Sequence, residues 1–507
     1  MPPGMGTYAR TNSLFVGQQA EGLPQVKELV IAANRLPVEI SADGLLSASP
    51  GGLASALSSV TSEGAQWVGW GGPASRRRKS FVHDALKLIP VTLTADDVTR
   101  YYQGFSNSIL WPLFHGRLRR VELNRSWWRS YRSVSERFAK AIVAVAPLGG
   151  TVWIHDYHLL LVPALIRSRR PDLRIGLFVH IPFPNVQLFS MLPWREDVIA
   201  GMLGADVVGF QVGEDVTNFL AATERFGGSW VGGNIVFSGA REIEVDAFPI
   251  SIDFSYWDGL GELAAEWASV NRRQLNVDTI YLGIDRMDYT KGITQRLQAF
   301  GELLDEERLS SEQAIFVQVA VPTRSDVVAY QDERAEVERL VEGINVRHPR
   351  QDGTPAVLYI DSSLDDVQMA GWHRTADSLV VTSLADGMNL VAKEFVATRG
   401  DLGGTLILSE FTGAAQDLAG AVIVNPYDIE AIKSALLETA AMPTSERQER
   451  MERMRAGVQH HDVHRWARTF LDRLEAAVPT GARRRALRGA RSAVAKVIRT
   501  QGLRGRS

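Results

Sequence analysis

The sequence predicts an α/β protein built from two doubly wound units that face each other across a cleft. Short apolar runs alternate with helical patterns between residues 150 and 210, and the same alternation returns between residues 279 and 426. Such alternation is typical of parallel sheets that carry helices on both faces. The 507 residues also exceed what one hydrophobic core usually holds, so we expect more than one domain.

The composition is that of an ordinary globular protein and excludes several function classes. Apolar residues make up 45% and charged residues 22% of the chain, and the net charge of −3 gives no overall case for nucleic acid or membrane binding. No cysteine is present, which excludes disulfides, thiol catalysis and cysteine-ligated zinc. No stretch has the apolar core of a signal peptide or of a membrane-spanning helix, so we expect a cytoplasmic protein.

The first elements lead into a glycine pair. After a loose arm over residues 1–26, a strand over residues 28–33 leads toward Pro37, where proline prevents its continuation. In the next segment, SPGGLASAL, Gly51 and Gly52 allow the backbone to approach a ligand at the start of a helix. A plain loop before a helix is the alternative.

Aromatic residues are concentrated in two segments, WVGWGG at residues 67–72 and YYQGFSNSILWPLFH at residues 101–115. Core packing explains most aromatic residues at this density. Flat rings also suit the wall of a sugar site, because a ring face packs on the C–H face of a pyranose.

Three apolar strands between residues 151 and 211 end in polar residues, which are Asp156, His180 and Gln211. Parallel sheets bind ligands at the carboxyl ends of their strands, so we expect these side chains at one site. The HDYH motif carries two histidines but no third ligand, and we predict no metal site.

A connection over residues 250–275 leads into the second unit. Its first strand, residues 279–284, runs into the motif DRMDYTKG, in which Arg286 and Lys291 precede a helix predicted over residues 291–306. Two cations beside a helix N-terminus suit a diphosphate. Surface charges that cap a helix are the alternative.

Residues 378–395, SLVVTSLADGMNLVAKEF, predict a strand, a tight turn and a helix N-terminus. The free N–H groups over residues 389–391 and the helix dipole favour a phosphate there. Asp386, at the carboxyl end of the strand, is placed to accept hydrogen bonds from a polyhydroxylated ligand. An ordinary connection with a solvated aspartate is the alternative.

The remaining elements repeat the alternation. We predict further strands over residues 314–320, 356–360, 405–410 and 421–426, a solvated helix face over 332–347, and a last helix near 464–476 that crosses back to the first unit. Residues 481–507 contain nine basic residues and no acidic one. That tail suits an anionic partner, docking on the acidic body of the chain, or a solvated extension.

Six motifs together resemble those of trehalose-6-phosphate synthases: NRLP, SPGG, HDYHLL, HIPFP, DRMDYTKG and ADGMNLVAKEF. They follow the family's order between about residues 28 and 475. The resemblance implies a retaining glycosyltransferase of the B-type fold, with two Rossmann-like domains. Its reaction would move glucose from a nucleoside diphosphate glucose to glucose 6-phosphate, giving α,α-trehalose 6-phosphate, with no cofactor besides the substrates.

The resemblance also implies how the chain divides. Residues 27–252 would bind the acceptor, with the helix near 464–476 packing back on them, and residues 253–463 would bind the nucleotide sugar. The arm at residues 1–26 and the basic tail at residues 481–507 lie outside both domains.

Site roles follow from the same resemblance. The implied donor contacts are Gly51, Gly52, His180, Arg286, Lys291, Arg374, Asp386, Leu390, Val391 and Glu394. Of these, the diphosphate falls to Arg286 and Lys291 and the ribose to Glu394. The implied acceptor contacts are Arg35, Tyr102 and Arg324 for the phosphate, Asp156 and Gln211 for hydroxyls, and Trp70 and Trp111 for the pocket wall.

The residues expected nearest the reacting bond are Asp156, His180, Arg286, Lys291 and Asp386. The resemblance implies that a donor phosphate oxygen takes the proton of the acceptor hydroxyl, so no general base is assigned to the protein. Two departures stand out: Ala385 replaces the family's usual arginine, and Ser383 and Leu384 replace its Pro-Leu.

Other functions remain open at this stage. A catalytically weak sensor of nucleotide sugar or sugar phosphate is one, and an enzyme that makes another glucoside or a C–N-linked pseudosugar is the second. A dinucleotide oxidoreductase lacks support, because no Gly-x-Gly-x-x-Gly follows the first strand. The fused phosphatase domain of some relatives is also not expected, since no Asp-x-Asp-x-Thr occurs. Donor base and oligomeric state, with a dimer or tetramer as alternatives to a monomer, stay undecided.

Overall fold

The computed structural model describes residues 29–40, 46–48, 56–57, 64–72, 79–117, 122–324 and 327–477. The arm at residues 1–26, the pair Gly51 and Gly52, and the basic tail at residues 481–507 lie outside the described residues.

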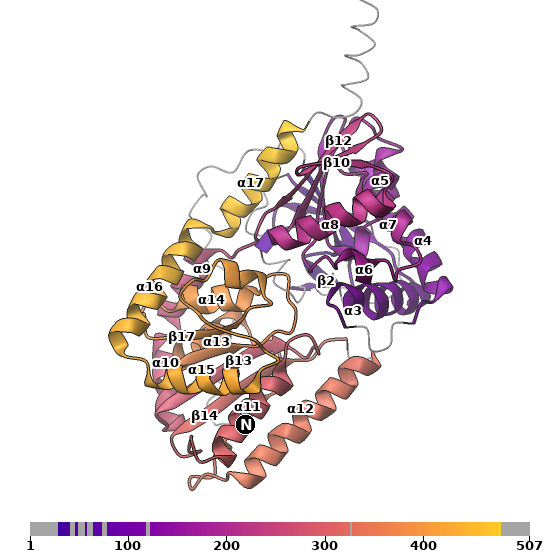
Figure 1. Cartoon of the computed structure of the whole chain (residues 1–507). Helices are drawn as coiled ribbons and strands as arrows, with labels where there is room; N and C mark the ends of the chain where they lie inside the picture. Colours follow the sequence, from indigo (N-terminus) through magenta and orange to yellow (C-terminus); the bar gives the residue numbers. More distant parts are fainter. Residues whose placement is uncertain are drawn as a thin grey trace, which may run out of the picture.

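The first unit, at the top of Figure 1, is built on a ten-stranded sheet. Its strand order is β10 (Trp230–Gly232), β11 (Ile235–Ser238), β12 (Arg241–Ala247), β9 (Val207–Phe210), β8 (Arg174–Phe178), β7 (Thr151–His155), β1 (Leu29–Arg35), β4 (Gln66–Trp70), β6 (Leu86–Val91) and β5 (Phe81–His83). The strands from β12 to β6 in this order pair in parallel, and antiparallel strands lie only at the two ends of this described sheet. A short ribbon of β2 (Val38–Ile40) and β3 (Leu46–Ala48) lies apart.

Helices of the first unit connect these strands. They are α2 (Ala95–Asp97), the π-helix η1 (Val98–Leu110), α3 (Trp111–Phe114), α4 (Arg125–Val145), the 3-10 helix η2 (Tyr157–Leu159), α5 (Val162–Arg167), α6 (Val186–Phe189), α7 (Arg195–Met202) and α8 (Gly213–Phe226). The aromatic segment at residues 101–115 therefore forms η1 and α3, which bury Tyr101 and Phe105 completely. The density of aromatic residues in this segment did not by itself predict a secondary structure.

The second unit has six parallel strands in the order β15 (Val357–Ile360), β14 (Ala314–Val321), β13 (Thr279–Arg286), β16 (Ser378–Val381), β17 (Thr405–Ser409) and β18 (Val422–Val424). Its helices are α9 (Phe254–Leu263), α10 (Ala265–Leu275), α11 (Ile293–Asp305), α12 (Val328–Arg347), α13 (Asp366–Thr375), α14 (Leu390–Thr398), η3 (Gly413–Gln416), α15 (Ile429–Ala441) and α16 (Thr444–His460). The predicted α/β class with two doubly wound units is confirmed.

The chain ends its described part by returning to the first unit. The helix α17 (Val463–Ala476) follows α16 and lies along the upper unit in Figure 1. Phe470 stacks on Trp153 with ring centroids 5.0 Å apart, and its ring leaves no room for a side chain at Gly176 or Gly209. The glycines in β8 and β9 thus form the groove that receives α17, where the helix near 464–476 was expected to pack.

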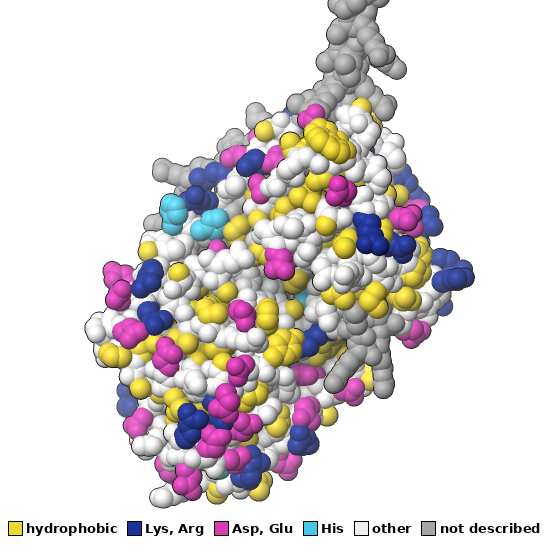
Figure 2. Space-filling view, viewed as in Figure 1, with side chains coloured by type: hydrophobic (Ala, Val, Ile, Leu, Met, Phe, Trp, Pro, Cys, Tyr) yellow, Lys and Arg dark blue, Asp and Glu magenta, His cyan; other side chains and the backbone are white. Residues whose placement is uncertain are grey.

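One hydrophobic core runs through both sheets. It joins residues of β1 and β7 to residues of β13, β14 and β16, with α9, α16 and α17 between them. No helix among the described residues is long and apolar enough to cross a membrane. On the face seen in Figure 2, basic and acidic side chains are interspersed over the lower unit.

Candidate active site

The site forms where the strand order reverses in each sheet, between β1 and β7 and between β13 and β16. Loops that follow such neighbouring strands diverge and leave a crevice at the carboxyl edge. Arg35 ends β1, Asp156 follows β7, Arg286 ends β13 and Asp386 follows β16. The structure therefore places these four predicted residues at the two reversal points.

Close contacts join the two reversal points. A Cβ at Gly387 would lie 2.0 Å from the carbonyl oxygen of His180, so the turn after β16 touches the backbone after β8. Arg324 of the second unit also donates from Nη2 to the Tyr157 hydroxyl of the first at 3.2 Å. The crevices of the two sheets consequently face each other.

Lys291 is brought to Asp386 by a glycine. Gly292 has a φ of +61°, and a Cβ there would meet the carbonyl oxygen of Thr382 at 2.0 Å. Because Gly292 adopts this left-handed conformation, α11 begins at Ile293 rather than at residue 291. Lys291 thus precedes the helix, and its Nζ donates to Asp386 Oδ2 at 2.5 Å.

The Asp386 carboxylate is held ionised. Burial raises its pKa, but the charge and hydrogen bond of Lys291 and a bond from Asn389 outweigh burial and leave the pKa below its ordinary value. The Ser383 hydroxyl also donates to Oδ2 at 3.3 Å. Asp386 is therefore an acceptor at neutral pH and has no proton to give.

The N-terminus of α14 offers donors beside this carboxylate. Asn389 has a φ of +102°, and its side chain accepts from the backbone N–H of Ala392 at 3.0 Å. The N–H groups of Leu390 and Val391 have no protein acceptor within the described part of the chain. These two N–H groups and the helix dipole favour an anion at this point.

Asp288 lies beneath the predicted cations and was missed by sequence reasoning. It is fully buried, and Arg324, at 3.7 Å, and Arg286, at 4.0 Å, share its Oδ2. Burial raises the pKa of Asp288, but Arg324, Arg286 and Lys291 together lower it below its ordinary value. The motif DRMDYTKG contains this acid, but spacing does not reveal that it is buried between cations.

Arg324 spans the cleft in a strained conformation. Its φ is +47°, which is uncommon for a residue with a side chain and often marks a functional site. Its guanidinium also donates to Tyr330 and lies 4.2 Å from the centre of the Trp111 ring. Trp111 lies 5.5 Å from the Arg286 guanidinium as well, so one ring contacts both arginines.

On the other side of the cleft, Arg35 lies over two aromatic rings. Its Cζ is 4.8 Å from the centre of the Trp70 ring and 5.5 Å from that of Tyr102, and Glu39 pairs with its guanidinium. A hollow of about 420 Å³ is lined in part by Arg35, Glu39 and Trp70. The indole N–H groups of Trp70 and Trp111 are buried without a protein partner, as expected of donors that await a ligand.

Asp156 occupies a second strained position, with a φ of +74°. The backbone N–H of His180 donates to its Oδ1 at 3.3 Å. Burial raises the pKa of Asp156 to about 6, although backbone bonds and the charges of Arg324 and Arg286 oppose that rise. The charges of two arginines of the second unit therefore act on this carboxyl group of the first unit.

His180 is held in one tautomer by two neighbours. The backbone N–H of Ile250 donates to Gln211 Oε1 at 2.9 Å, which leaves Gln211 Nε2 to donate to His180 Nδ1 at 3.3 Å. His180 Nε2 then carries the proton and donates to His155 Nδ1 at 3.2 Å. Burial lowers the pKa of His180 to about 3, so the ring is neutral.

This arrangement gives Gln211 a role that the sequence did not predict. Its side chain is 1% exposed and both ends of its amide bond protein groups, so it supports His180. His180 itself must release one of its two ring bonds before it can bond a sugar hydroxyl.

Arg374, which was predicted to contact the donor, is not brought together with the residues described above. Arg374 lies at the end of α13 and pairs with Asp401 at 2.8 Å, and Asp401 precedes β17. In parallel α/β folds the end of such a helix lies at the amino edge of the sheet, opposite the site.

Glu394, on the inner face of α14, is 9% exposed, and burial and the charge of Asp366 raise its pKa to about 8.

His115 is another site residue that sequence reasoning missed. It is buried, its Nδ1 bonds the Trp111 carbonyl oxygen at 2.8 Å, and its ring lies against Trp111 with centroids 4.1 Å apart. Burial lowers its pKa to about 4, so it places no charge near Asp386 at neutral pH. The His-final aromatic segment is the signal that could have found it.

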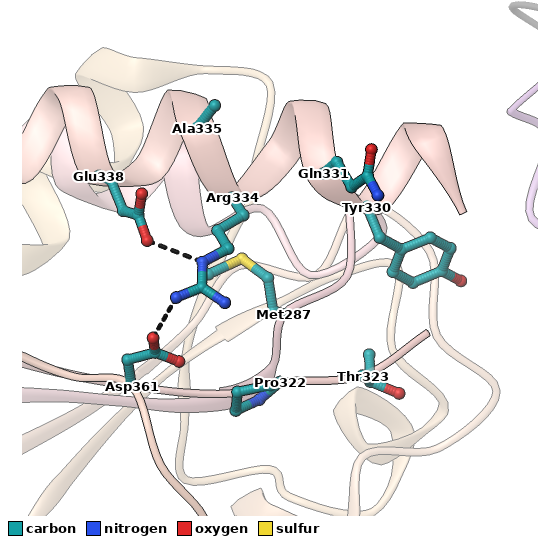
Figure 3. A pocket seen from close by; sticks show the side chains of 9 residues that line it. All are labelled: Met287, Pro322, Thr323, Tyr330, Gln331, Arg334, Ala335, Glu338 and Asp361. Atoms are coloured by element: carbon teal, nitrogen blue, oxygen red, sulfur yellow. Dashed lines mark hydrogen bonds and ion pairs between the residues drawn. The ribbon is translucent and has the colours of Figure 1, made fainter. Parts of the chain in front are cut away.

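A cavity of about 240 Å³ opens beside this site, at the carboxyl ends of β13, β14 and β15 (Figure 3). In Figure 3 Arg334 bridges Glu338 and Asp361 across it, and Tyr330 lies at the far end of the view. The Tyr330 hydroxyl reaches Arg324 and Asp288, so the cavity and the cation cluster share this side chain.

Comparison with known proteins shows which family the chain belongs to. The profile of glycosyltransferase family 20 matches residues 27–476. A trehalose-6-phosphate synthase of Mycolicibacterium smegmatis is 44% identical over 478 residues, which cover 91% of this chain and 95% of the relative. The trehalose-6-phosphate synthase of Mycobacterium tuberculosis is 43% identical over 484 residues, with 90% and 96% covered.

Solved structures of trehalose-phosphate synthases also superpose on this chain. The α,α-trehalose-phosphate synthase (UDP-forming) from Burkholderia xenovorans, in complex with glucose-6-phosphate, superposes with a TM-score of 0.83 at 31% identity, covering 89% of this chain and all of that one. The E. coli enzyme bound with UDP-2-fluoro glucose gives a TM-score of 0.81 at 31% identity, covering 89% and 99%. Because the profile spans nearly the whole described chain and the relatives align over at least 95% of their length, this protein belongs to glycosyltransferase family 20.

Proposed function

We propose that this protein is a trehalose-6-phosphate synthase, a retaining glucosyltransferase. It moves glucose from a nucleoside diphosphate glucose to C1 of glucose 6-phosphate and forms α,α-trehalose 6-phosphate. The observation that carries the proposal is a pair of phosphate-suited sets in one cleft, of which the second draws on both units. Arg286, Lys291 and the α14 N-terminus make one set, and Arg35 with Arg324 makes the other.

Arg286 and Lys291 hold the donor diphosphate. Breaking the bond between the anomeric carbon and the phosphate oxygen leaves negative charge on the diphosphate. Cations and free N–H groups that are already in place stabilise that charge more strongly than the charge of the bound donor. Asp386 accepts from hydroxyls of the glucose, and Lys291, bonded to it at 2.5 Å, keeps it ionised.

Arg35, Tyr102 and Arg324 hold the phosphate of glucose 6-phosphate, and Asp156 accepts from its sugar hydroxyls. Trp111, which contacts the guanidinium groups of both Arg286 and Arg324, forms the wall between the two substrates. Because Arg324 comes from the second unit, the acceptor phosphate is bound by both units. Acceptor binding therefore favours the closed cleft, which excludes water that would hydrolyse the donor.

Neither Asp386 nor His180 takes the acceptor proton in this reaction. Asp386 is bonded to Lys291, Ser383 and Asn389, and His180 bonds protein groups through both ring nitrogens. A donor phosphate oxygen on the same face of the sugar receives the proton, so the paired carboxylates of glycosidases are not required. The two substrates need no further cofactor.

We further propose that residues 27–252 with α17 bind the acceptor and residues 253–463 bind the nucleotide sugar. A cytoplasmic location is supported by the absence of cysteine. A dimer or tetramer is an alternative to a monomer, and size-exclusion chromatography with light scattering would distinguish them.

The function is tested by measuring nucleotide release in parallel reactions that contain glucose 6-phosphate and one donor each, UDP-, GDP- or ADP-glucose. We expect turnover with at least one donor, formation of a non-reducing disaccharide phosphate, and no product when unphosphorylated glucose replaces glucose 6-phosphate. Binding of both substrates without turnover would favour a sensor. Product from unphosphorylated sugars would contradict the assignment of the acceptor phosphate site.

A further inference from the structure

Asp288 has its two carboxylate oxygens committed to different neighbours. Oδ1 accepts from the backbone N–H and from the hydroxyl of Thr290, both at 3.0 Å, which fixes the side chain within the turn between β13 and α11. The carboxylate is fully buried, so water does not compete for the second oxygen.

The second oxygen, Oδ2, faces two arginines that belong to different substrates in the proposed function. Arg324 Nη1 lies 3.7 Å and Arg286 Nη2 lies 4.0 Å from it, and the Tyr330 hydroxyl lies at 3.4 Å. Trp111 contacts both guanidinium groups through its ring. One buried anion and one indole ring thus hold the arginine of the donor site and an arginine of the acceptor site.

The two arginines depend on this anion to different degrees. The Arg324 side chain is 7% exposed and also bonds the hydroxyls of Tyr157 and Tyr330. The Arg286 side chain is 41% exposed, and Asp288 is its one carboxylate partner within 4.0 Å in the described part of the chain. Loss of the Asp288 charge would therefore free Arg286 far more than Arg324.

We propose that Asp288 is a positioning residue that holds Arg286 ready for the departing diphosphate and, through the same oxygen, fixes the distance between the donor and acceptor phosphate sites. The inference rests on the proposed function of Arg286 and Arg324. It assigns no contact between Asp288 and either substrate, because the carboxylate is buried beneath the arginines.

A double-mutant cycle tests this role. Asp288→Asn keeps an oxygen for Thr290 and removes the charge, and we expect kcat to fall about 10- to 100-fold in the otherwise unchanged protein. In an Arg286→Ala background the same substitution should lower kcat by less than about 3-fold, because its target is already gone. An equal factor in both backgrounds, or no effect in the first, would overturn the proposal.

Asp285→Asn is the matched control. Asp285 is also buried, near the end of the preceding strand β13, and pairs with Arg296 at 2.5 Å, an arginine with no role in the proposed site. Its loss should lower the melting temperature but affect kcat equally with and without Arg286. Circular dichroism and melting curves for each variant separate a folding defect from misplacement of Arg286.

Tyr330→Phe gives a second route if Asp288→Asn does not fold. It removes only the hydroxyl that joins Arg324 to Asp288, so the KM for glucose 6-phosphate should rise about 3- to 10-fold while kcat changes by less than about 2-fold. An unchanged KM would contradict the acceptor half of the inference. Near-normal kcat in Arg286→Ala alone would instead contradict the proposed function, so the two failures are distinguishable.

Discussion

Arg286 is the residue on which the donor chemistry depends most. Replacing Arg286 by alanine should lower kcat by a few hundredfold, on the order of 3 kcal/mol of transition-state stabilisation, because the departing diphosphate loses a preorganised cation. Steady-state kinetics with both substrates varied would measure the effect. Arg339→Ala, an exposed arginine of α12 paired with Glu336, is the control and should keep normal turnover. Near-normal kcat in Arg286→Ala would refute the diphosphate assignment.

Glu394 makes the protein less stable as the pH rises. Burial raises its pKa from the ordinary 4.5 to about 8, so between these values the folded state binds a proton that the unfolded state has lost. The stabilisation that this carboxyl contributes is therefore fully present below its pKa in the unfolded state. It is lost as the pH rises through its pKa in the folded state. From about pH 7 to about pH 8.5 this carboxyl should remove about 1 kcal/mol.

Glu394→Gln isolates that contribution. Asp215 and Glu333, whose pKa values burial raises to about 7, add their own pH dependence, so the comparison must be with the variant. Buried histidines such as His180, with a pKa near 3, are neutral in both states above pH 7. Melting temperatures should decline less steeply with pH in Glu394→Gln. Parallel curves for the two proteins would show that Glu394 is ionised when folded.

The role of a single residue was predictable from the sequence where a local motif contains that residue. It was not predictable where burial against distant parts of the chain decides the role. Lys291 and Asp386 were each assigned from a local turn, and their contact follows because both turns end neighbouring parallel strands. Asp288 and Tyr330 lie 42 positions apart and meet only in the folded protein. The role of Gln211 also depends on its neighbours, because Ile250 and His180 use both ends of its amide.

At the scale of elements, the turn between β16 and α14 depends on contact with the backbone of the first unit. Alanine at Gly387 would place Cβ 2.0 Å from the His180 carbonyl oxygen, so the turn or the opposing segment must move. We expect Gly387→Ala to cost on the order of 2 kcal/mol of stability and to lower kcat at least about tenfold. Melting curves and initial rates would measure both effects.

Gly213→Ala is the control for that substitution. Gly213 begins α8, and no atom lies within 4 Å of a Cβ built there. Its stability should change by less than about 0.5 kcal/mol. If Gly387→Ala changed stability as little as Gly213→Ala, the turn at Gly387 would not be in the described contact with the His180 backbone.

Element boundaries show what periodicity leaves undetermined. The apolar runs identified the central strands well, because a strand buried on both faces has few polar residues, as in β1 and β13. The start of α11 was placed two residues early, since the left-handed Gly292 ends the turn after Lys291. The expected donor contact of Arg374 came from the family resemblance, and a matched motif does not show which edge of the sheet the last turn of α13 reaches.

At the scale of the whole molecule, the shared core predicts that the two sheets unfold together. Residues of both sheets belong to one hydrophobic cluster, to which α16 and α17 contribute. Denaturant titrations followed by fluorescence and by circular dichroism should therefore give coincident single transitions. Two separated transitions would show that the sheets are independently stable.

Phe470→Ala would weaken that shared core from its last helix. The ring is fully buried on Trp153 and fills the groove over Gly176, so its removal should cost about 3–5 kcal/mol. Denaturant midpoints would measure the loss. Leu148→Ala, at a side chain that is 87% exposed, should change stability by less than about 0.5 kcal/mol. Similar midpoints for both variants would contradict the packing role of α17.

The placement of α17 also has a consequence for synthesis of the chain. The groove at Gly176 and Gly209 belongs to strands translated early, whereas Phe470, which fills it, is among the last described residues to leave the ribosome. Until then the nascent first sheet exposes Trp153 and Phe178 on that face. Exposed apolar surface on a growing chain is a substrate for chaperones and a route to aggregation. Ribosome-bound chains that stop before residue 463 should therefore recruit chaperones, and chains long enough to seat α17 should release them.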